Sequence, residues 1–350
     1  MQKHAGKLLF LGLLIFAVLI FNGCGKREEP AAPAQSATPP GPAAPAATAM
    51  PAPPSLPDVI RFSKTALYPE GVDYDAKDNR FLVTSLREGI VGAVSGDGNY
   101  QVVFQDSNLV SAIGIRIDSA RDRVLVCNSD PGVSMHTKPE NQGKLAGLGV
   151  FQLSTGALIK YIDLAALSQG GGHFCNDIAL DSTGIAYATD SFSPIIYKID
   201  ADLNASIFFS NERFTGEGFN LNGIVVKDDY LLVTKYNEGV LFKVPLNDPE
   251  KFSQVTIAET FPGADGLLWA ADGSLVVIAN LQTNKVFKLS SSDNWVSAAV
   301  VNRLDTGQVY ATTGVEINGA VYALYAMLHV LFNPETKAHI ETFEIHKQPL

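Results

Sequence analysis

A short pattern recurs six times between residues 68 and 318 and constrains the fold more than any other feature. Each copy has a small residue, an apolar strand-like stretch and a turn, as in YPEGVDYD, SAIGIRID, FCNDIALD, NLNGIVVK, GADGLLWA and ATTGVEIN. The aligned residues are separated by 43, 63, 46, 43 and 48 positions and are Gly71, Gly114, Asp177, Gly223, Gly266 and Gly314. A repeat of this length indicates an architecture of similar units that pack in series.

Each copy is followed by further strand-like segments. The second segments are RFLVTS, RVLVCNS, IAYATDS, YLLVTKY, SLVVIAN and AVYALYA, and the third are GIVGAVS, GVFQLS, PIIYKID, GVLFKVP, NKVFKLS and HVLFNPE. A fourth follows, such as NYQVVFQ or ASIFFSN, and no long amphipathic helix is evident after residue 58. Short segments rich in β-branched and aromatic residues, separated by Asp, Asn and Gly turns, indicate an all-β chain.

Six units of about four strands predict a six-bladed β-propeller over residues 58–350. A large β-sandwich or barrel is the alternative, but a four-strand period repeated six times is hard to reconcile with either. DVIRFS, near residues 58–63, is expected to help close the ring with the last blade, although the sequence does not settle which strand closes it.

The position before each aligned small residue carries the chemistry. In a propeller the first strand of each blade lines the central channel, so these six positions converge at one mouth. They are Glu70, Ile113, Asn176, Asn222, Asp265 and Thr313. Glu70, Asn176, Asn222 and Asp265 would give an all-oxygen site of charge about −2, which suits Ca²⁺. Mg²⁺ or Mn²⁺ are possible, whereas Zn²⁺ prefers His or Cys. Alternatively, the polar residues merely cap turns.

Several of these motifs resemble a known family. YPEGVDYD, CNDIALDSTGIAYATDS, NGIVVKDDYLLVTKY and ADGLLWAADGSLVVIAN are similar to the senescence-marker-protein (regucalcin) and gluconolactonase family. The resemblance implies a six-bladed propeller with one divalent metal in its channel, held by Glu70, Asn222 and Asp265, with Asn176 contacting metal or substrate. It also implies hydrolysis of lactones. Phe174 stands where some members have an Arg that binds sugar lactones, so a less polar substrate is expected.

Turnover would need a base beside the metal. Asp265 is one candidate, and His173, in the loop before Asn176, is a second, although an exposed loop histidine is the simpler interpretation. Loops that follow the second strands should border the mouth, so substrate contacts are predicted for Asn176, Phe174, Asp190, Lys235, Tyr236 and Asn280. The long step in blade 2 comes from a Gly-rich insertion at residues 131–147, which is expected to act as a lid or specificity element.

The N-terminal segment predicts export and membrane anchoring. Residues 1–23 have a basic start and an apolar run from Leu8 to Phe21, as in a signal peptide, and Cys24 after Gly23 resembles a bacterial lipobox cysteine. Residues 24–57 are rich in Ala and Pro and form an expected extended linker. A lipid on Cys24 would place the chain in the bacterial cell envelope, at the outer membrane or periplasmic face.

Charge and cysteine content limit the partners. The formal net charge of −10 argues against nucleic acid and against an anionic membrane surface as partners, and a monomer is expected. Cys127 and Cys175 could form a disulfide in an exported protein or remain as two buried thiols. The sequence favours a metal-dependent hydrolase of a small lactone or ester. The alternatives are a propeller that binds a ligand or protein without turnover and a strictosidine-synthase-like propeller, which would not need the four oxygen ligands.

Overall fold

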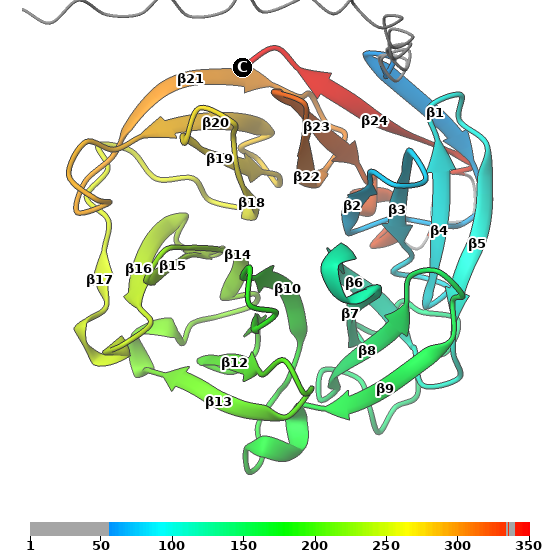
Figure 1. Ribbon diagram of the computed structural model, residues 1–350, viewed down its shortest axis with the longest axis horizontal. Coiled ribbons are helices and arrows are strands. Elements are labelled where there is room, and N and C mark those ends of the chain that lie inside the picture. The colour runs from blue at the N-terminus through cyan, green and yellow to red at the C-terminus, as the bar shows by residue number, and fades with distance from the viewer. Residues whose placement is uncertain (1–55, 334, 336–339) are drawn as a thin grey trace, which may run out of the picture. The chain divides into compact units, whose positions relative to one another are not determined.

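A computed structural model of the chain describes residues 56–333, 335 and 340–350. The predicted signal peptide, Cys24 and nearly all of the predicted linker lie outside the described residues. A compact unit spans Pro54–Leu350. Its strands form six four-stranded antiparallel sheets, arranged as the blades of a β-propeller around a central channel (Figure 1). The predicted fold class is therefore confirmed.

Five blades are built from consecutive strands. Blade 1 contains β2 (Val72–Asp75), β3 (Arg80–Thr84), β4 (Ile90–Ser95) and β5 (Tyr100–Gln105). Blade 2 contains β6 (Ser111–Asp118), β7 (Arg123–Ser129), β8 (Ala146–Gln152) and β9 (Leu158–Asp163). Blade 3 contains β10 (Cys175–Leu180), β11 (Ala186–Asp190), β12 (Ile195–Ile199) and β13 (Ala205–Ser210). Blade 4 contains β14 (Leu221–Lys227), β15 (Tyr230–Lys235), β16 (Val240–Pro245) and β17 (Ser253–Gln254). Blade 5 contains β18 (Ala264–Trp269), β19 (Leu275–Ala279), β20 (Lys285–Ser290) and β21 (Ala299–Asp305).

Blade 6 closes the ring with both ends of the chain. Its strands are β22 (Ala311–Ile317), β23 (Ala320–Tyr325), β24 (Thr342–Gln348) and, outermost, β1 (Val59–Ser63). β1 pairs antiparallel with β24, with Val59 opposite His346 and Ser63 opposite Thr342. The expected role of DVIRFS in closure is confirmed, and β1 is the closing strand.

One predicted strand is wrong. HVLFNPE does not form the third strand of blade 6, because Leu328–Leu331 is the short helix α1, and β24 takes that place instead. The first four residues of β24, TFEI, alternate exposed or half-buried side chains with buried ones. The other helical elements among the described residues are single 3₁₀ turns, η1 (Ser119–Arg121), η2 (Ala165–Leu167), η3 (Glu212–Phe214) and η4 (Pro249–Lys251). No helix within the described part of the chain could cross a membrane.

The aligned glycines let neighbouring first strands approach at the channel. A Cβ on Gly114 would lie 2.4 Å from the Asn176 carbonyl oxygen, and one on Gly223 would lie 2.1 Å from that of Asp265. Each of these glycines therefore contacts the backbone of the residue before the aligned position in the next blade, and a side chain would force the blades apart. This contact explains why the repeat keeps a small residue at this position.

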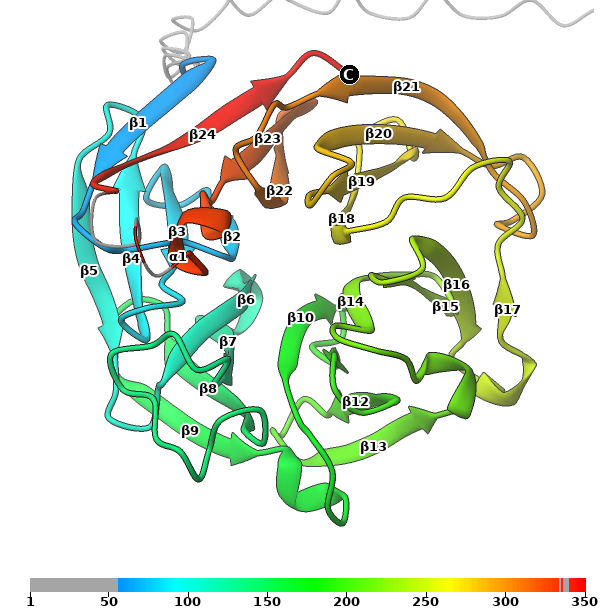
Figure 2. The same cartoon turned by 180° about the vertical axis from the view of Figure 1, so that it is seen from behind.

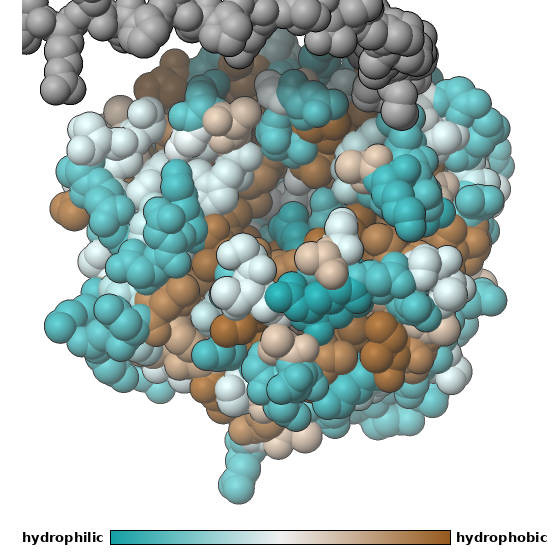
Figure 3. All heavy atoms as spheres, viewed as in Figure 1, coloured by the Kyte–Doolittle hydropathy of each residue, from teal (hydrophilic) through white to brown (hydrophobic). Residues whose placement is uncertain are grey.

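The two faces of the propeller differ. α1 lies on the near face in Figure 2, together with the loops that lead into the first strands. We call this face the mouth. Figure 1 is viewed from the opposite face, and the space-filling view in Figure 3 shows that this face is hollowed near its centre.

Candidate functional site

Backbone irregularities turn the predicted site residues into the channel. In blades 2 to 6 the pairing between the first and second strand shifts register at the aligned position, for example between Cys175 and Ile178 and between Ala264 and Leu267. β-Bulges of this kind are frequent beside active sites, because they redirect side chains out of the alternation of the strand. In blade 1 the site residue, Glu70, instead precedes β2.

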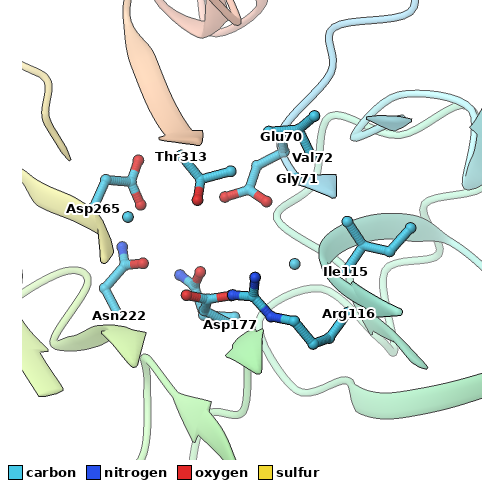
Figure 4. A pocket seen from close by; sticks show the side chains of 12 residues that line it. Glu70, Gly71, Val72, Ile115, Arg116, Asp177, Asn222, Asp265 and Thr313 are labelled. Carbon is cyan, nitrogen blue, oxygen red and sulfur yellow. The ribbon is translucent and has the colours of Figure 1, made fainter. Parts of the chain in front are cut away.

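The structure brings the four predicted metal ligands together. Glu70, Asn176, Asn222 and Asp265 line both a cavity at the mouth and a small chamber directly below it in the channel. We call these four residues the oxygen ring. Figure 4 shows Glu70, Asn222 and Asp265 pointing toward the centre of the channel. All four are at most 8% exposed, although their positions in the chain span nearly 200 residues.

The two carboxylates of the oxygen ring are buried with little to balance their negative charge. The Glu70 side chain has no hydrogen-bond or ion-pair partner among the described residues, and burial and the charges of Asp265 and Asp177 raise its pKa well above the ordinary value. Asp265 accepts hydrogen bonds from Asn280 and Asn222, yet burial and the charge of Asp177 raise its pKa to about 8. Burying like charges without a counterion is unfavourable, so this arrangement favours a bound cation or proton.

The donor set fits a hard divalent cation. Asn176 donates from Nδ2 to Ser191 Oγ at 2.9 Å, which leaves its amide oxygen available to the channel. The chamber below the oxygen ring has a volume of about 10 Å³, near the ~10–15 Å³ that holds one water-sized occupant. No group of three or more His, Cys, Asp or Glu side chains within the described ranges could hold a metal. A metal here would therefore depend on the two amide oxygens together with Glu70 and Asp265, a mixture that Ca²⁺ accepts.

Two charged residues of the channel were not predicted as site residues. Asp177 lies in the chamber, where its carboxylate accepts from the backbone N–H of Ile178 at 2.8 Å and of Ile224 at 3.3 Å. Arg116 lies beside Asp177 in the chamber, with Nη2 3.7 Å from Asp177 Oδ1 and Nε donating to the Ile178 carbonyl at 2.9 Å. Figure 4 shows the Arg116 guanidinium beside Asp177. Arg116 also lines the cavity below, so it separates the chamber from the lower half of the channel.

The cavity at the mouth is mostly apolar above the oxygen ring. Phe174 and Tyr236, two of the residues predicted to contact substrate, line this cavity. Its other lining residues outside the oxygen ring are Leu86, Ile113, Pro131, Phe219, Tyr310, Leu328 and Phe332. Phe174 and Phe219 pack edge to face with ring centroids 5.1 Å apart. Phe219 and Tyr310 were not predicted from the sequence, although they stand three residues before Asn222 and Thr313, the residues that precede the aligned glycines of their blades.

Asn280 supports the oxygen ring without lining either cavity. Its side chain is fully buried, donates to Asp265 and accepts from the Tyr236 hydroxyl at 2.7 Å. The Tyr236 hydroxyl also lies 3.1 Å from that of Tyr310. Asn280 is therefore placed to orient Asp265 rather than to touch a substrate.

His173 is placed away from both cavities. It is 4% exposed, and its Nδ1 lies 2.8 Å from Asp190 Oδ2 while its Nε2 lies 3.0 Å from Ser168 Oγ. Both ring nitrogens are thus engaged, and the hydrogen bond to Asp190 raises the pKa of His173 despite its burial. This placement argues against the predicted role of His173 as a general base, because neither nitrogen faces a substrate.

Asp190 and Lys235 also have structural partners. Asp190 is fully buried and accepts hydrogen bonds from the Phe174 backbone and from the Tyr197 hydroxyl, both at 2.8 Å. Lys235 donates to the Thr215 carbonyl and to Glu238, both at 2.6 Å. Neither residue lines the cavity at the mouth or the chamber, so the structure does not favour the predicted substrate contacts for them.

The insertion in blade 2 is held down by hydrogen bonds and reaches the cavity only through Pro131. Met135 N donates to the Arg87 carbonyl at 2.8 Å, and the Gly143 carbonyl accepts from His173 N at 3.0 Å.

A disulfide between Cys127 of β7 and Cys175 of β10 joins blades 2 and 3. This resolves the alternatives left open for the two cysteines, and it fixes the residue that precedes Asn176.

Comparison with known proteins shows similarity in fold and none in sequence family. No family model and no curated protein matches the sequence. Among solved structures, the major allergen Mala s 1 of Malassezia sympodialis aligns with a TM-score of 0.66 at 17% identity, over 84% of this chain and 96% of that one. A luciferin-regenerating enzyme aligns with a TM-score of 0.57 at 13% identity, over 83% and 96%. Regucalcin of Agrobacterium tumefaciens, a calcium-binding protein, aligns with a TM-score of 0.54 at 15% identity, over 81% and 92%. The resemblance to the regucalcin and gluconolactonase family is thus supported at the level of the fold.

Proposed function

We propose that the chain is an exported, membrane-anchored hydrolase of a lactone or ester that depends on a divalent metal, with Ca²⁺ as the favoured ion. The observation that carries the proposal is the buried carboxylate of Glu70, which faces Asp265 and two amide oxygens across the channel and has no counterion there. The likeness in fold to a calcium-binding regucalcin and to a luciferin-regenerating enzyme supports the same direction.

The oxygen ring would hold the cation, and the apolar walls of the cavity at the mouth would hold the body of the substrate. When bound, a divalent cation would supply polarisation of the carbonyl oxygen. Asp265 is the residue best placed to accept the proton of the attacking water, because it belongs to the ring and Asn280 fixes one of its oxygens. As water adds to the acyl carbon, the bond to the ring or alkoxy oxygen breaks and that oxygen takes up a proton.

The side chains that line the cavity at the mouth indicate the class of substrate. Phe174, Phe219 and Tyr310 present aromatic surface around the oxygen ring. Among the described residues that line this cavity, Glu70 and Asp265 are the charged ones. A substrate with many hydroxyl groups would lose its hydration without finding partners here, so less polar lactones should react faster.

A ligand-binding propeller without turnover is the second candidate. The placement of His173 favours it, because the histidine predicted as a base is held by Asp190 and Ser168. In that case the oxygen ring and the aromatic mouth would bind a cation and a small molecule together.

The anchor and the partners complete the proposal. Gly23-Cys24 after the apolar run supports lipid attachment at Cys24, and hence a location at the outer membrane or periplasmic face of a bacterial envelope. The disulfide between Cys127 and Cys175 is consistent with an oxidising compartment. The net charge of −10 supports a monomer that does not bind nucleic acid.

The test is hydrolysis of a lactone panel by the full chain, with Ca²⁺ and with a chelator. Hydrolysis that is lost with chelator and restored by Ca²⁺ would support the enzyme. If no lactone or ester is hydrolysed but Ca²⁺ binding gives calorimetric heat, the binding propeller is the better interpretation. Absence of both results would remove the metal from the proposal.

A further inference from the structure

A second, larger cavity lies beside the mouth, over blades 5 and 6. Its volume is about 640 Å³, within the roughly 300–1,000 Å³ typical of small-molecule sites. It is formed by the loop after β19, the segments that lead into β18 and β22, and α1. We call this cavity the side groove.

The side groove adjoins the cavity at the mouth through an aromatic partition. Tyr310 lines both cavities, and its ring stacks on His329 with centroids 6.2 Å apart and planes 24° apart. α1 follows the same division, because Leu328 faces the cavity at the mouth and His329 faces the side groove. The cavity at the mouth and the side groove are therefore adjacent, with Tyr310 between them.

The lining of the side groove is uncharged. Its polar side chains are the amides of Gln282, Asn284 and Gln308, none of which has a side-chain hydrogen bond to another described residue. Burial lowers the pKa of His329, so its imidazole is neutral near pH 7. Leu281 is 45% exposed, an uncovered apolar side chain at the rim. Such a lining matches a neutral, largely apolar group and offers nothing to a charged one.

Two residues that line the side groove have an unusual backbone conformation. Leu281 and Tyr310 both have φ of 50°, in the left-handed region that bulky residues rarely adopt. Left-handed conformations of non-glycine residues cost free energy and cluster at ligand sites. Here they occur at the aromatic partition and at the exposed apolar rim of the groove.

We propose that the side groove binds an uncharged, largely apolar substituent of the substrate while the oxygen ring holds its lactone group. This inference rests on the proposed function and narrows it. The substrate class is a lactone that carries a neutral chain several carbons long, with room for one amide or hydroxyl group opposite Gln282 and Gln308.

The test is a homologous series of γ-lactones with side chains from methyl to octyl, hydrolysed by the full chain under saturating Ca²⁺. Each methylene that leaves water should raise kcat/KM by about two- to fourfold until the groove is filled. The same series is titrated by calorimetry into protein treated with chelator, where the dissociation constant should fall with chain length.

Leu281→Asn is the informative variant. Asn tolerates the left-handed backbone at this position, so the fold should be retained while apolar contact is lost. We expect the dependence of kcat/KM on chain length to flatten by at least half relative to wild type. Leu167→Asn is the matched control, because Leu167 is 37% exposed and lines neither cavity.

The outcomes separate this inference from the proposed function. Hydrolysis of short lactones with no gain from longer chains, in rate or in binding, would overturn the groove and leave the hydrolase intact. Binding that strengthens with chain length, without hydrolysis of any lactone, would support the groove and overturn the hydrolase. An equal loss in Leu281→Asn and Leu167→Asn would also overturn the groove, because the effect would not be local.

Discussion

Replacing Asp265 with Asn should make the metal-free protein more stable. Asp265 is 6% exposed and lies near Glu70 and Asp177, with no cation beside it among the described residues. Its pKa of about 8, against an ordinary value of 3.8, means that folding near neutral pH takes up a proton at this site. One pKa unit corresponds to ~1.4 kcal/mol, so the site costs the folded state ~4 kcal/mol at pH 7.

The variant removes most of this cost. Asn keeps the shape of the side chain but offers one fewer acceptor to Asn280 and Asn222, which offsets ~1–1.5 kcal/mol. We therefore expect a net gain of ~2–3 kcal/mol, or a rise in Tm of ~5 °C for a domain of this size. Because the folded pKa is raised, stability from this site is present at low pH and is lost as pH rises toward 8. The gain in Asp265→Asn should accordingly be small at pH 4 and full at pH 8.

Calcium should cancel most of the stability difference between the two proteins. A ligand at 100 times its dissociation constant stabilises the folded state by ~2.7 kcal/mol. The wild type should show this gain, and Asp265→Asn should show little, when thermal unfolding is followed at pH 7 with Ca²⁺ and with chelator.

Asp190→Asn is the matched control for this experiment. Asp190 is also a fully buried carboxylate, but it is surrounded by donors from Phe174, Tyr197 and His173. Its replacement should destabilise the protein and leave the response to Ca²⁺ unchanged. If Asp265→Asn behaves in the same way, Asp265 is a structural acceptor and the reasoning about the oxygen ring is refuted.

Three further predictions follow from other parts of the chain. The hydrogen bond to Asp190 raises the pKa of His173 above 6.5, so its pH-dependent stabilisation is complete below that value and is lost as pH rises through the folded pKa. His173→Gln should therefore differ most from wild type in urea unfolding at pH 5–6, and an equal difference at pH 9 would contradict this. Replacing Cys127 and Cys175 together by Ala should lower the free energy of unfolding by about 4 kcal/mol, because the bridge closes a loop of 48 residues. If the wild type unfolds at the same denaturant midpoint under reducing and oxidising conditions, the bridge contributes nothing to stability. Cys24→Ser should move the protein from the detergent phase to the aqueous phase in phase partitioning, and unchanged partitioning would exclude the lipid anchor.

The repeat made the fold and the oxygen ring predictable. A propeller places equivalent positions of successive blades around one axis, so residues at the same position of the repeat lie close together in space. Glu70 and Asp265 are nearly 200 residues apart, yet both precede an aligned glycine and both line the chamber. The bulges were not visible in the sequence, but they act at the same position in five blades and so preserve the alignment.

The orientation of single side chains was not predictable in this way. Asp190 and Lys235 belong to strand ends near the mouth, as expected, but they turn toward Tyr197 and Glu238, partners that no repeat position specifies. Arg116 was missed because it occupies the first strand of blade 2, in a stretch interpreted as apolar lining. Buried polar residues are oriented by whichever donors and acceptors remain unsatisfied nearby, which is a property of the packed state.

Arg116 closes the lower end of the chamber in the channel. Its guanidinium is held by the Ile178 carbonyl and Asp177, and the chamber above it has room for about one ion or water molecule. If a lactone is hydrolysed at the oxygen ring, the hydroxy acid product could not leave through the opposite face. It would have to leave through the mouth, where the lactone entered. In such a dead-end site the product occupies the entrance until it departs, and the hydroxy acid should compete with fresh substrate in steady-state inhibition.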